Sequence, residues 1–405
     1  MLVNISLLNE LFRGFSIQRW NDKIRPIEFT EMDKHAHKMI IAYALGKYEE
    51  MAGKKVNWIN IIKGGIFELF RRIVISDIKS PIFYKIKVGN HAAYTKLNEW
   101  VYNKLEAMIE NEEIKQDLFN YLNNEDYLDK HSAHLLAAAH RYASYWEFQI
   151  IKLSNPPDSY SIKQIERELL NDIHKYLDEF IGLQHLMTKK PIHDFIDLCG
   201  QLRFQIRWAQ IPRVPKTSVL GHSMTVAVLS YFFALENNAC PKRLYNDFYG
   251  GLFHDLPEAV TRDIISPVKK SSEEFENFLK ELELELAQEE IFPLIEKEWI
   301  PEIKYFILDE FENRITVDNE IKFENYSIND INEKYNSEEF NPVDGELIRT
   351  ADHLAAFLEA WHSSNYGIKS EDMTSAMQTI KQNYANKNLG KTNIKSLYLG
   401  FNSNF

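Results

Sequence analysis

An internal repeat constrains the fold of this chain more than any other feature. The segment GGIFELFRRIVISDIKSP begins at Gly64, and the segment GGLFHDLPEAVTRDIISP begins at Gly250, 186 residues later. The two segments share Gly, Gly, Phe, Val, Asp, Ile, Ser and Pro in register. Self-similarity at a fixed separation is the sequence signature of a repeated structural unit.

Two further blocks match in the same order. Upstream, the Arg-Trp step at 19–20 parallels the one at 207–208, and one inserted residue then places His35 opposite His222. Downstream, SAHLLAAAHRYASYW resembles TADHLAAFLEAWHSS. Three matching blocks in one order predict two tandem copies of the same domain.

The hydrophobic pattern predicts that both copies are helical. Apolar residues recur at three- and four-residue steps in many segments, and Gly and Pro are sparse. Ser223–Leu235 is nearly continuously apolar, as a buried helix is, and Asp352–Trp361 is similar. Few runs alternate with period two, and Ile315–Phe323 is the candidate for a short strand. We expect an all-α fold without the roughly 18-residue apolar stretch that a membrane-spanning helix needs.

The domain boundary is expected between residues 155 and 190. The segment Ser154–Ser161 contains Pro156 and Pro157, which break a helix. A polar amphipathic helix from Ile162 to about Leu186 follows. We therefore divide the chain into a first copy at residues 1–155, a helical linker at 156–190 and a second copy at 191–405.

Composition limits the partners and the location. The formal net charge of -12 repels phosphate backbones, so duplex nucleic acid is not an expected partner. The two cysteines, Cys199 and Cys240, are too few for a disulfide scaffold or a zinc finger. The start, Met1–Phe15, lacks the basic and apolar regions of a signal peptide. We expect a cytoplasmic protein with no membrane partner.

The His-Asp pair at His254 and Asp255 is the first candidate for chemistry. Apolar Leu252 and Phe253 precede it, and Pro257 follows at a position suited to the start of a new helix. Imidazole nitrogen and carboxylate oxygen at such a junction suit a divalent Zn, Mn, Co or Fe ion. The other His-Asp pair, at 193–194, is better explained as a polar pair near a helix start.

His222 and Asp352 are the candidates for the remaining ligands. Each lies at the start of a predicted buried helix, where an unpartnered carboxylate is costly. Taken singly, His222 fits a hydrogen-bonded core histidine and Asp352 fits a capping residue. Taken together with His254 and Asp255, they form an ordered pattern of H…HD…D.

That pattern resembles the HD superfamily of metal-dependent phosphohydrolases. Within it, the C-terminal half is similar to the bacterial 5′-deoxynucleotidase group. The stretches that carry this resemblance cover about 50 residues. They are RWAQIPRVPKTSVLGHS, FHDLPEAVTRDIISPVKK and IRTADHLAAFLEAW.

The resemblance implies a role for each matching position. One divalent metal (Mn, Co, Zn, Fe or Mg) would be bound by four ligands, which are His222, His254, Asp255 and Asp352. Glu258 would act as general acid or base, and Asp263 would contact substrate or orient water. Arg207 would hold the substrate phosphate in a bidentate manner, with Trp208 beside the sugar. Ser266 and Lys269 would lie on the phosphate side, although Lys269 fits a solvated surface lysine equally well.

The sequence departs from this group at three places near the pocket. Gly221 stands where the group commonly has a glutamate, Pro215 where an arginine is expected, and Arg262 replaces a small residue. These departures leave the base and sugar preference open. The acidic segment Ser272–Glu298 is an extension of the second copy, and it fits either a solvated amphipathic helix or a lid over the pocket.

The first copy lacks the ligand set. Glu68 and Leu69 stand opposite His254 and Asp255, and Arg72 stands opposite Glu258. Ala133 is aligned with Asp352. We interpret this half as a degenerate domain, and expect the two HD-type halves to pack as an internal pseudo-dimer. A homo-oligomer in addition to this pair is allowed. The histidines at 131, 134 and 140 fit core or solvated positions better than a second metal site.

The expected function is release of phosphate from a (deoxy)nucleoside 5′-monophosphate. Two alternatives stay open. The first is hydrolysis of a nucleoside triphosphate or signalling nucleotide, which Arg213, Arg262, Lys269 and Lys270 would favour if they surround the site. The second is a nucleotide-binding regulator without catalysis, against which the complete ligand set argues.

Overall fold

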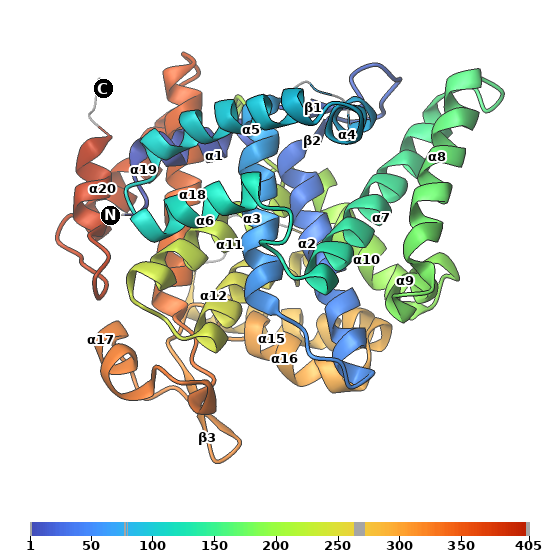
Figure 1. Ribbon diagram of the computed structural model, residues 1–405. Coiled ribbons are helices and arrows are strands. Elements are labelled where there is room, and N and C mark those ends of the chain that lie inside the picture. Colours follow the sequence, from blue (N-terminus) through green and yellow to red (C-terminus); the bar gives the residue numbers. More distant parts are fainter. Residues whose placement is uncertain (1, 77, 79, 263–271, 402–405) are drawn as a thin grey trace.

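The computed structural model describes residues 2–76, 78, 80–262 and 272–401. The described chain is almost entirely helical, which confirms the predicted all-α class (Figure 1). Two small antiparallel sheets of two strands each are the exceptions. Most long helices begin after a Ser, Thr, Asn or Asp whose side chain accepts a backbone N–H three residues later, as Thr30 and Ser218 do.

The N-terminal half contains two short strands and a layer of helices. Its elements are α1 (Ile5–Phe12), β1 (Gln18–Arg19), β2 (Phe29–Thr30), α2 (Glu31–Met51), α3 (Trp58–Ile75), α4 (Ser80–Gly89), α5 (His91–Leu105), α6 (Glu112–Asn123) and α7 (Lys130–Ser154). Two helices then connect the halves, namely α8 (Tyr160–Leu177) and α9 (Ile181–Met187).

The C-terminal half has the same kind of core with a longer insertion. Its main elements are α10 (Pro191–Gln201), α11 (Val219–Glu236), α12 (Pro241–Phe253), α13 (Glu258–Thr261), α15 (Glu273–Leu286), α16 (Ile300–Ile307), β3 (Ile315–Val317), β4 (Glu320–Lys322), α17 (Ile328–Asp330), α18 (Gly345–Asn365), α19 (Glu371–Tyr384) and α20 (Ile394–Gly400). Short 3-10 and π turns join several of these helices, and one of them, η3 (Leu202–Phe204), follows α10.

Two predicted elements are divided in the structure. The strand expected at Ile315–Phe323 is the hairpin β3–β4, whose tight turn places Asp318 and Asn319 at positive φ. The helix expected from Ile162 to Leu186 is α8 followed by α9, and the break between them lies at residues 178–180. The proline-containing segment before α8 lies outside helices, as predicted.

The helix α11 forms the centre of the C-terminal half. By length and composition its 18 residues could span a membrane, which the sequence pattern did not reveal. Within the fold, however, 89% of this helix is buried. It packs against α12, α18 and α2, so its apolar surface is covered on several sides by other helices.

Helices of the two halves pack in similar combinations and contact one another. In the N-terminal half α2 packs on α3 and α7, and in the C-terminal half α11 packs on α12 and α18. Across the two halves, α2 contacts α11 and α3 contacts α12. The aromatic ring of Phe12 also stacks on that of His362, with centroids 4.1 Å apart. Buried apolar residues from both halves therefore form one continuous cluster.

Strand pairing places the two halves in a register that differs from the sequence alignment by one residue. Gln18 pairs with Thr30 immediately before α2, and Ile206 pairs with Ser218 immediately before α11. Counted from these pairs, the fourth residue of α11 is His222 and the fourth residue of α2 is Lys34. The inserted residue that aligned His35 with His222 is therefore wrong, because the loop before each helix has the same length.

Gly251 in α12 allows the close approach that positions the candidate site. A Cβ at this position would lie 3.0 Å from the backbone N and Cα of Ala227 in α11. We expect Gly251→Ala to lower the free energy of unfolding by about 1–3 kcal/mol through overpacking. A gain in helix propensity of about 1 kcal/mol offsets part of this loss. Chemical denaturation would measure the change.

Gly65→Ala is the matched control for this substitution. Gly65 precedes the N-terminal copy's ligand positions as Gly251 precedes His254, but its added Cβ would meet only the flexible side chain of Met39. That side chain can turn aside, so the control should be close to wild type in stability. Equal stability of the two variants would show that the α11–α12 approach is not tight.

Candidate metal centre

The structure brings the four predicted ligands together from three helices. His222 lies in the first turn of α11, His254 and Asp255 follow the end of α12, and Asp352 lies in α18. His222 Nε2 is 2.9 Å from Asp352 Oδ1 and 3.9 Å from Asp255 Oδ2. His254 Nε2 is 3.2 Å from Asp255 Oδ2. One ligand atom from each of His222, His254 and Asp255 lies within 4.8 Å of the other two.

The His254 ring is oriented for ligation by its own helix. Its Nδ1 lies 2.8 Å from the carbonyl oxygen of Gly251, to which it donates a hydrogen bond. This bond fixes the tautomer and leaves the lone pair of Nε2 available. Among the described residues, buried His254 Nε2 and Asp255 Oδ2 have no hydrogen-bond partner. Buried polar atoms of this kind normally have one, so their arrangement fits a cation between them.

A carboxylate that the sequence argument did not identify lies beside the His222 ring. Its Nδ1 is 3.5 Å from Glu359 Oε1, while its Nε2 faces the other ligands. Glu359 also accepts hydrogen bonds from Trp208 Nε1 at 2.8 Å and from Thr217 Oγ1 at 2.9 Å. The only sequence signal for Glu359 was its spacing, seven residues after Asp352 on the same face of α18.

Charge pairing dominates the protonation of the site. Burial lowers the pKa of His254, but the adjacent Asp255 carboxylate outweighs this effect and raises the pKa to about 9. Burial likewise opposes ionisation of Asp352, yet its hydrogen bond with His222 and nearby positive charges hold its pKa below the usual value. The carboxylates thus stay ionised, and a divalent cation would take the place of the proton that His254 otherwise holds.

Asp352 occupies a different place in its helix from the one predicted. The sequence pattern placed it at a helix start, but α18 begins at Gly345 after Asp344. Buried Asp344 is held by Arg243 through two hydrogen bonds of 2.6 and 2.8 Å, which fixes that earlier start. Asp352 therefore lies two turns inside the helix, so a capping role is excluded.

A cavity of about 780 Å³ opens beside the ligands. Arg207, Asp255, Glu258 and Asp352 line its inner end. The helix α15, from the acidic extension, lines the opposite side and contributes Leu279 among others. This extension is therefore part of the pocket wall.

Of the other residues predicted to contact the substrate, only some can be located relative to the cavity. Arg207 Nη1 is 3.6 Å from Asp255 Oδ2, which places the guanidinium at the edge of the ligand cluster. The Trp208 indole is directed to Glu359, and Trp208 is not among the described residues that line the cavity. Asp263, Ser266 and Lys269 lie outside the described residues.

Other histidines have different surroundings. His131 Nε2 is 3.2 Å from Glu49, and His134 Nδ1 is 2.7 Å from Glu179. Within the described part of the chain, the His222 cluster is the only group of three or more such side chains whose atoms suit a metal. The second His-Asp pair, at residues 193–194, lies near the start of α10, where Asp194 is largely exposed.

Removing the charge of Glu359 is expected to weaken metal binding. Carboxylates that orient a metal-binding histidine typically contribute 10–100-fold to affinity, so Glu359→Gln should lose about that much. Metal titration of the purified variant would measure it. Glu312→Gln is the control, because Glu312 lines the same cavity but pairs with Arg349. Equal affinities in both variants would mean that Glu359 does not orient His222.

Comparison with known protein families gives an independent result. A search of curated proteins found no match to this chain. A family model described as HD domain matches residues 199–381. This segment contains His222, His254, Asp255 and Asp352, together with the orienting Glu359. The candidate metal centre therefore lies within the segment that matches the HD domain model.

Proposed function

We propose that the chain is a metal-dependent phosphohydrolase that releases phosphate from (deoxy)nucleoside 5′-monophosphates. HD domains are generally phosphohydrolases that bind a divalent metal, and the match at residues 199–381 supports that class. The observation that carries the proposal is the convergence of His222, His254, Asp255 and Asp352 beside one cavity.

The donor set fits one divalent ion. Two imidazole nitrogens and two carboxylates suit Mn, Co, Zn or Fe, and Mg is compatible with the carboxylates. Such an ion would act as a Lewis acid on a phosphoryl oxygen and would lower the pKa of water. Arg207 would bind the substrate phosphate, since its guanidinium is held beside Asp255 and is 3.4 Å from Glu359 Oε2.

Glu258 would transfer the proton. It is the first residue of α13, one turn after Asp255, and it is buried at the inner end of the cavity. A carboxylate beside the attacking water can accept its proton and pass it to the leaving alcohol oxygen. Arg207 would thus bind the phosphate, and Glu258 would transfer the proton on the same substrate.

The charge of the cavity favours a monophosphate over a triphosphate. Among its described lining residues the cations are Arg207, Lys280 and Arg349, whereas carboxylates are three times as numerous. Arg213, which would have favoured a triphosphate, is buried and donates to Pro215 O and Thr217 Oγ1. The volume of about 780 Å³ lies in the range that accommodates a nucleotide-sized ligand.

Phosphate release from a panel of nucleotides tests this function. The full-length protein would be assayed with Mn, Co, Mg and Zn against deoxy- and ribonucleoside mono-, di- and triphosphates. We expect the highest kcat/KM with a monophosphate. Faster hydrolysis of a triphosphate would contradict the substrate proposal, and absence of release from every nucleotide would indicate a non-catalytic regulator.

We further infer that the N-terminal half is a degenerate copy and that the halves form a pseudo-dimer. The contacts of α2 with α11 and of α3 with α12 support a paired arrangement of equivalent helices.

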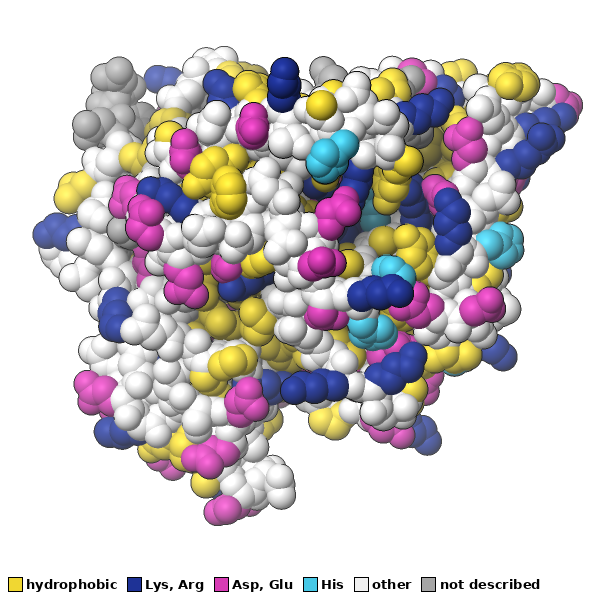
Figure 2. Space-filling view, viewed as in Figure 1, with side chains coloured by type: hydrophobic (Ala, Val, Ile, Leu, Met, Phe, Trp, Pro, Cys, Tyr) yellow, Lys and Arg dark blue, Asp and Glu magenta, His cyan; other side chains and the backbone are white. Residues whose placement is uncertain are grey.

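The two free cysteines are consistent with a reducing cytoplasm. On the face in Figure 2, acidic and basic side chains are interspersed, which supports a small-molecule partner over duplex nucleic acid.

A further inference from the structure

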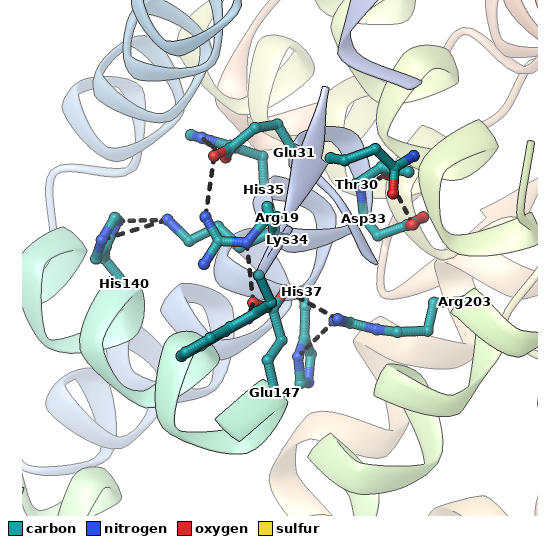
Figure 3. Close-up of polar contacts among 12 residues, drawn as sticks. Arg19, Thr30, Glu31, Asp33, Lys34, His35, His37, His140, Glu147 and Arg203 are labelled. Carbon is teal, nitrogen blue, oxygen red and sulfur yellow. Dashed lines mark hydrogen bonds and ion pairs between the residues drawn. The ribbon is translucent and has the colours of Figure 1, made fainter. Parts of the chain in front are cut away.

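The N-terminal half keeps the phosphate-side arrangement of the C-terminal half. Trp20 and Trp208 both have positive φ, 56° and 58° respectively. Trp20 Nε1 donates to Glu147 at 2.8 Å, just as Trp208 Nε1 donates to Glu359 at 2.8 Å. Arg19, like Arg207, bonds to the same carboxylate as its neighbouring tryptophan. Figure 3 shows Arg19 between Glu31 and Glu147.

The metal-ligand positions in this half have different chemistry. Glu147 in α7 and Glu359 in α18 accept hydrogen bonds from equivalent tryptophans, so the two helices can be aligned on these glutamates. In this alignment His140, seven residues before Glu147, is equivalent to Asp352. The earlier alignment with Ala133 is therefore wrong. The Lys34 ammonium contacts His140 Nδ1, where His222 contacts Asp352 in the other half (Figure 3). Leu69 cannot ligate a metal.

The proton-transfer position has also reversed its charge. Arg72 stands opposite Glu258, and its guanidinium donates to Glu31 and to the carbonyl oxygen of Ile78. The helix α3 continues through this position to Ile75, whereas α12 ends at Phe253. This half therefore lacks a carboxylate that could accept a proton from water at the position that Glu258 occupies in the other half.

The side chains around the two equivalent sites differ in their balance of charge. In the C-terminal half, the carboxylates Asp255, Glu258, Asp352 and Glu359 outnumber Arg207 and Arg213, as a site for a dication requires. Around Arg19 and Lys34 in the N-terminal half, the cations are Arg19, Lys34, Lys38, Arg71 and Arg72, and the carboxylates are Glu31, Asp33, Glu68 and Glu147. Arg203, from η3 of the C-terminal half, adds a sixth cation to this network through its ion pair with Glu147.

Burial lowers the pKa of both lysines in this network, although carboxylates lie near them. Burial, together with the neighbouring Arg19, lowers the pKa of Lys34 well below its usual value. Burial also lowers the pKa of Lys38 to about 8, although Glu68 opposes the shift. An anion in this region would restore both charges and relieve part of the desolvation cost.

A cavity gives an anion access to these cations. It has a volume of about 640 Å³ and is lined by Arg19, Trp20, Arg72, Tyr84 and His140, among others. A second cavity of about 440 Å³ shares Arg72, Tyr84 and His140 and adds Lys38 and Arg71. Aromatic and cationic side chains therefore border the same space, which has the size of a nucleotide site.

We propose that the N-terminal cavity binds a nucleoside monophosphate as a phosphomonoester dianion, without a metal and without hydrolysing it. Arg19 and Arg72 contact the phosphate, and Trp20 and Tyr84 border the remainder of the ligand. The fixed cations replace the metal of the other half. The proposal rests on the equivalence of the two halves but not on the hydrolytic activity of the C-terminal site.

Binding to metal-stripped, full-length protein tests this site. Arg207→Gln is the host variant, because it removes the phosphate-binding arginine of the C-terminal cavity. Deoxyadenosine 5′-monophosphate and inorganic phosphate, each titrated in EDTA and followed by calorimetry, are the probes. We expect one equivalent of the nucleotide to bind, competitively with phosphate. Absence of binding in the host would overturn the proposal.

Two further substitutions in the host assign the binding to the N-terminal cavity. Adding Arg72→Gln should weaken binding about 10–100-fold, the usual value of a charged hydrogen bond. Arg141 lies in the wall of the same cavity but outside the buried network, so Arg141→Gln should also weaken nucleotide binding. This variant keeps the test informative if Arg72→Gln does not fold. Arg13→Gln, on an exposed side chain outside the cavity, should have no effect. Unchanged affinity in Arg141→Gln and any folded Arg72→Gln variant, or phosphate release from the bound nucleotide in EDTA, would refute the proposal.

Discussion

Replacing His254 by alanine is expected to remove the metal and to abolish phosphate release. The imidazole Nε2 of His254 faces Asp255 Oδ2 at 3.2 Å, and its Nδ1 is fixed by Gly251 O. Loss of a partner that only orients a ligand already costs 10–100-fold in affinity, so loss of the ligand should cost more than about 10²-fold. Elemental analysis and a phosphate assay would measure both effects.

His193→Ala is the matched control for this prediction. His193 also precedes an aspartate, and its Nδ1 is 3.0 Å from Asp194 Oδ1, but the pair lies on α10, away from the cavity. This variant should keep the metal and full activity. Metal retained in His254→Ala would show that the HD pair is not part of the binding site.

Glu258→Gln is expected to keep the metal and to lower kcat by about 10²–10⁴-fold, the usual contribution of a general acid or base. The substitution changes little in shape, so the fold around α13 should persist. The Gln205 side chain donates to the backbone oxygen of Glu258, a bond that the substitution does not remove. Steady-state kinetics together with metal analysis would separate loss of chemistry from loss of the ion.

Glu276→Gln provides the comparison for this effect. Glu276 lies on α15 in the wall of the same cavity and contributes negative charge there. It is on a different helix from every predicted metal ligand. It should change KM at most. If Glu258→Gln kept near-normal kcat, Glu258 would be a structural residue and another group would have to move the proton.

The four residues that spacing and resemblance selected, His222, His254, Asp255 and Asp352, lie close together in the structure. An ordered set of residue types can be recognised even where the loops between them differ in length. Their role as metal ligands stays a prediction. The register of the first copy was less secure. Lys34 and His35 are both buried in α2, so burial alone could not decide which of them faces the site.

The features that could not be predicted from the sequence depend mostly on hydrogen bonds between residues far apart in the chain. The start of α18 depends on the buried pair Arg243 and Asp344, which are 101 residues apart. The role of Glu359 depends on Trp208 and Thr217, which approach it only in the folded chain. These contacts are set by tertiary packing, whereas the helical class follows from local periodicity.

The central claim is that one metal centre in the C-terminal half performs phosphate release. Titration of metal-stripped, full-length protein with Mn, followed by the rate of phosphate release from a deoxynucleoside monophosphate, tests it most directly. The account predicts that the rate rises in proportion to added metal and levels off at one equivalent per chain. Full activity in the stripped protein, or a rate that keeps rising to two equivalents, would contradict it.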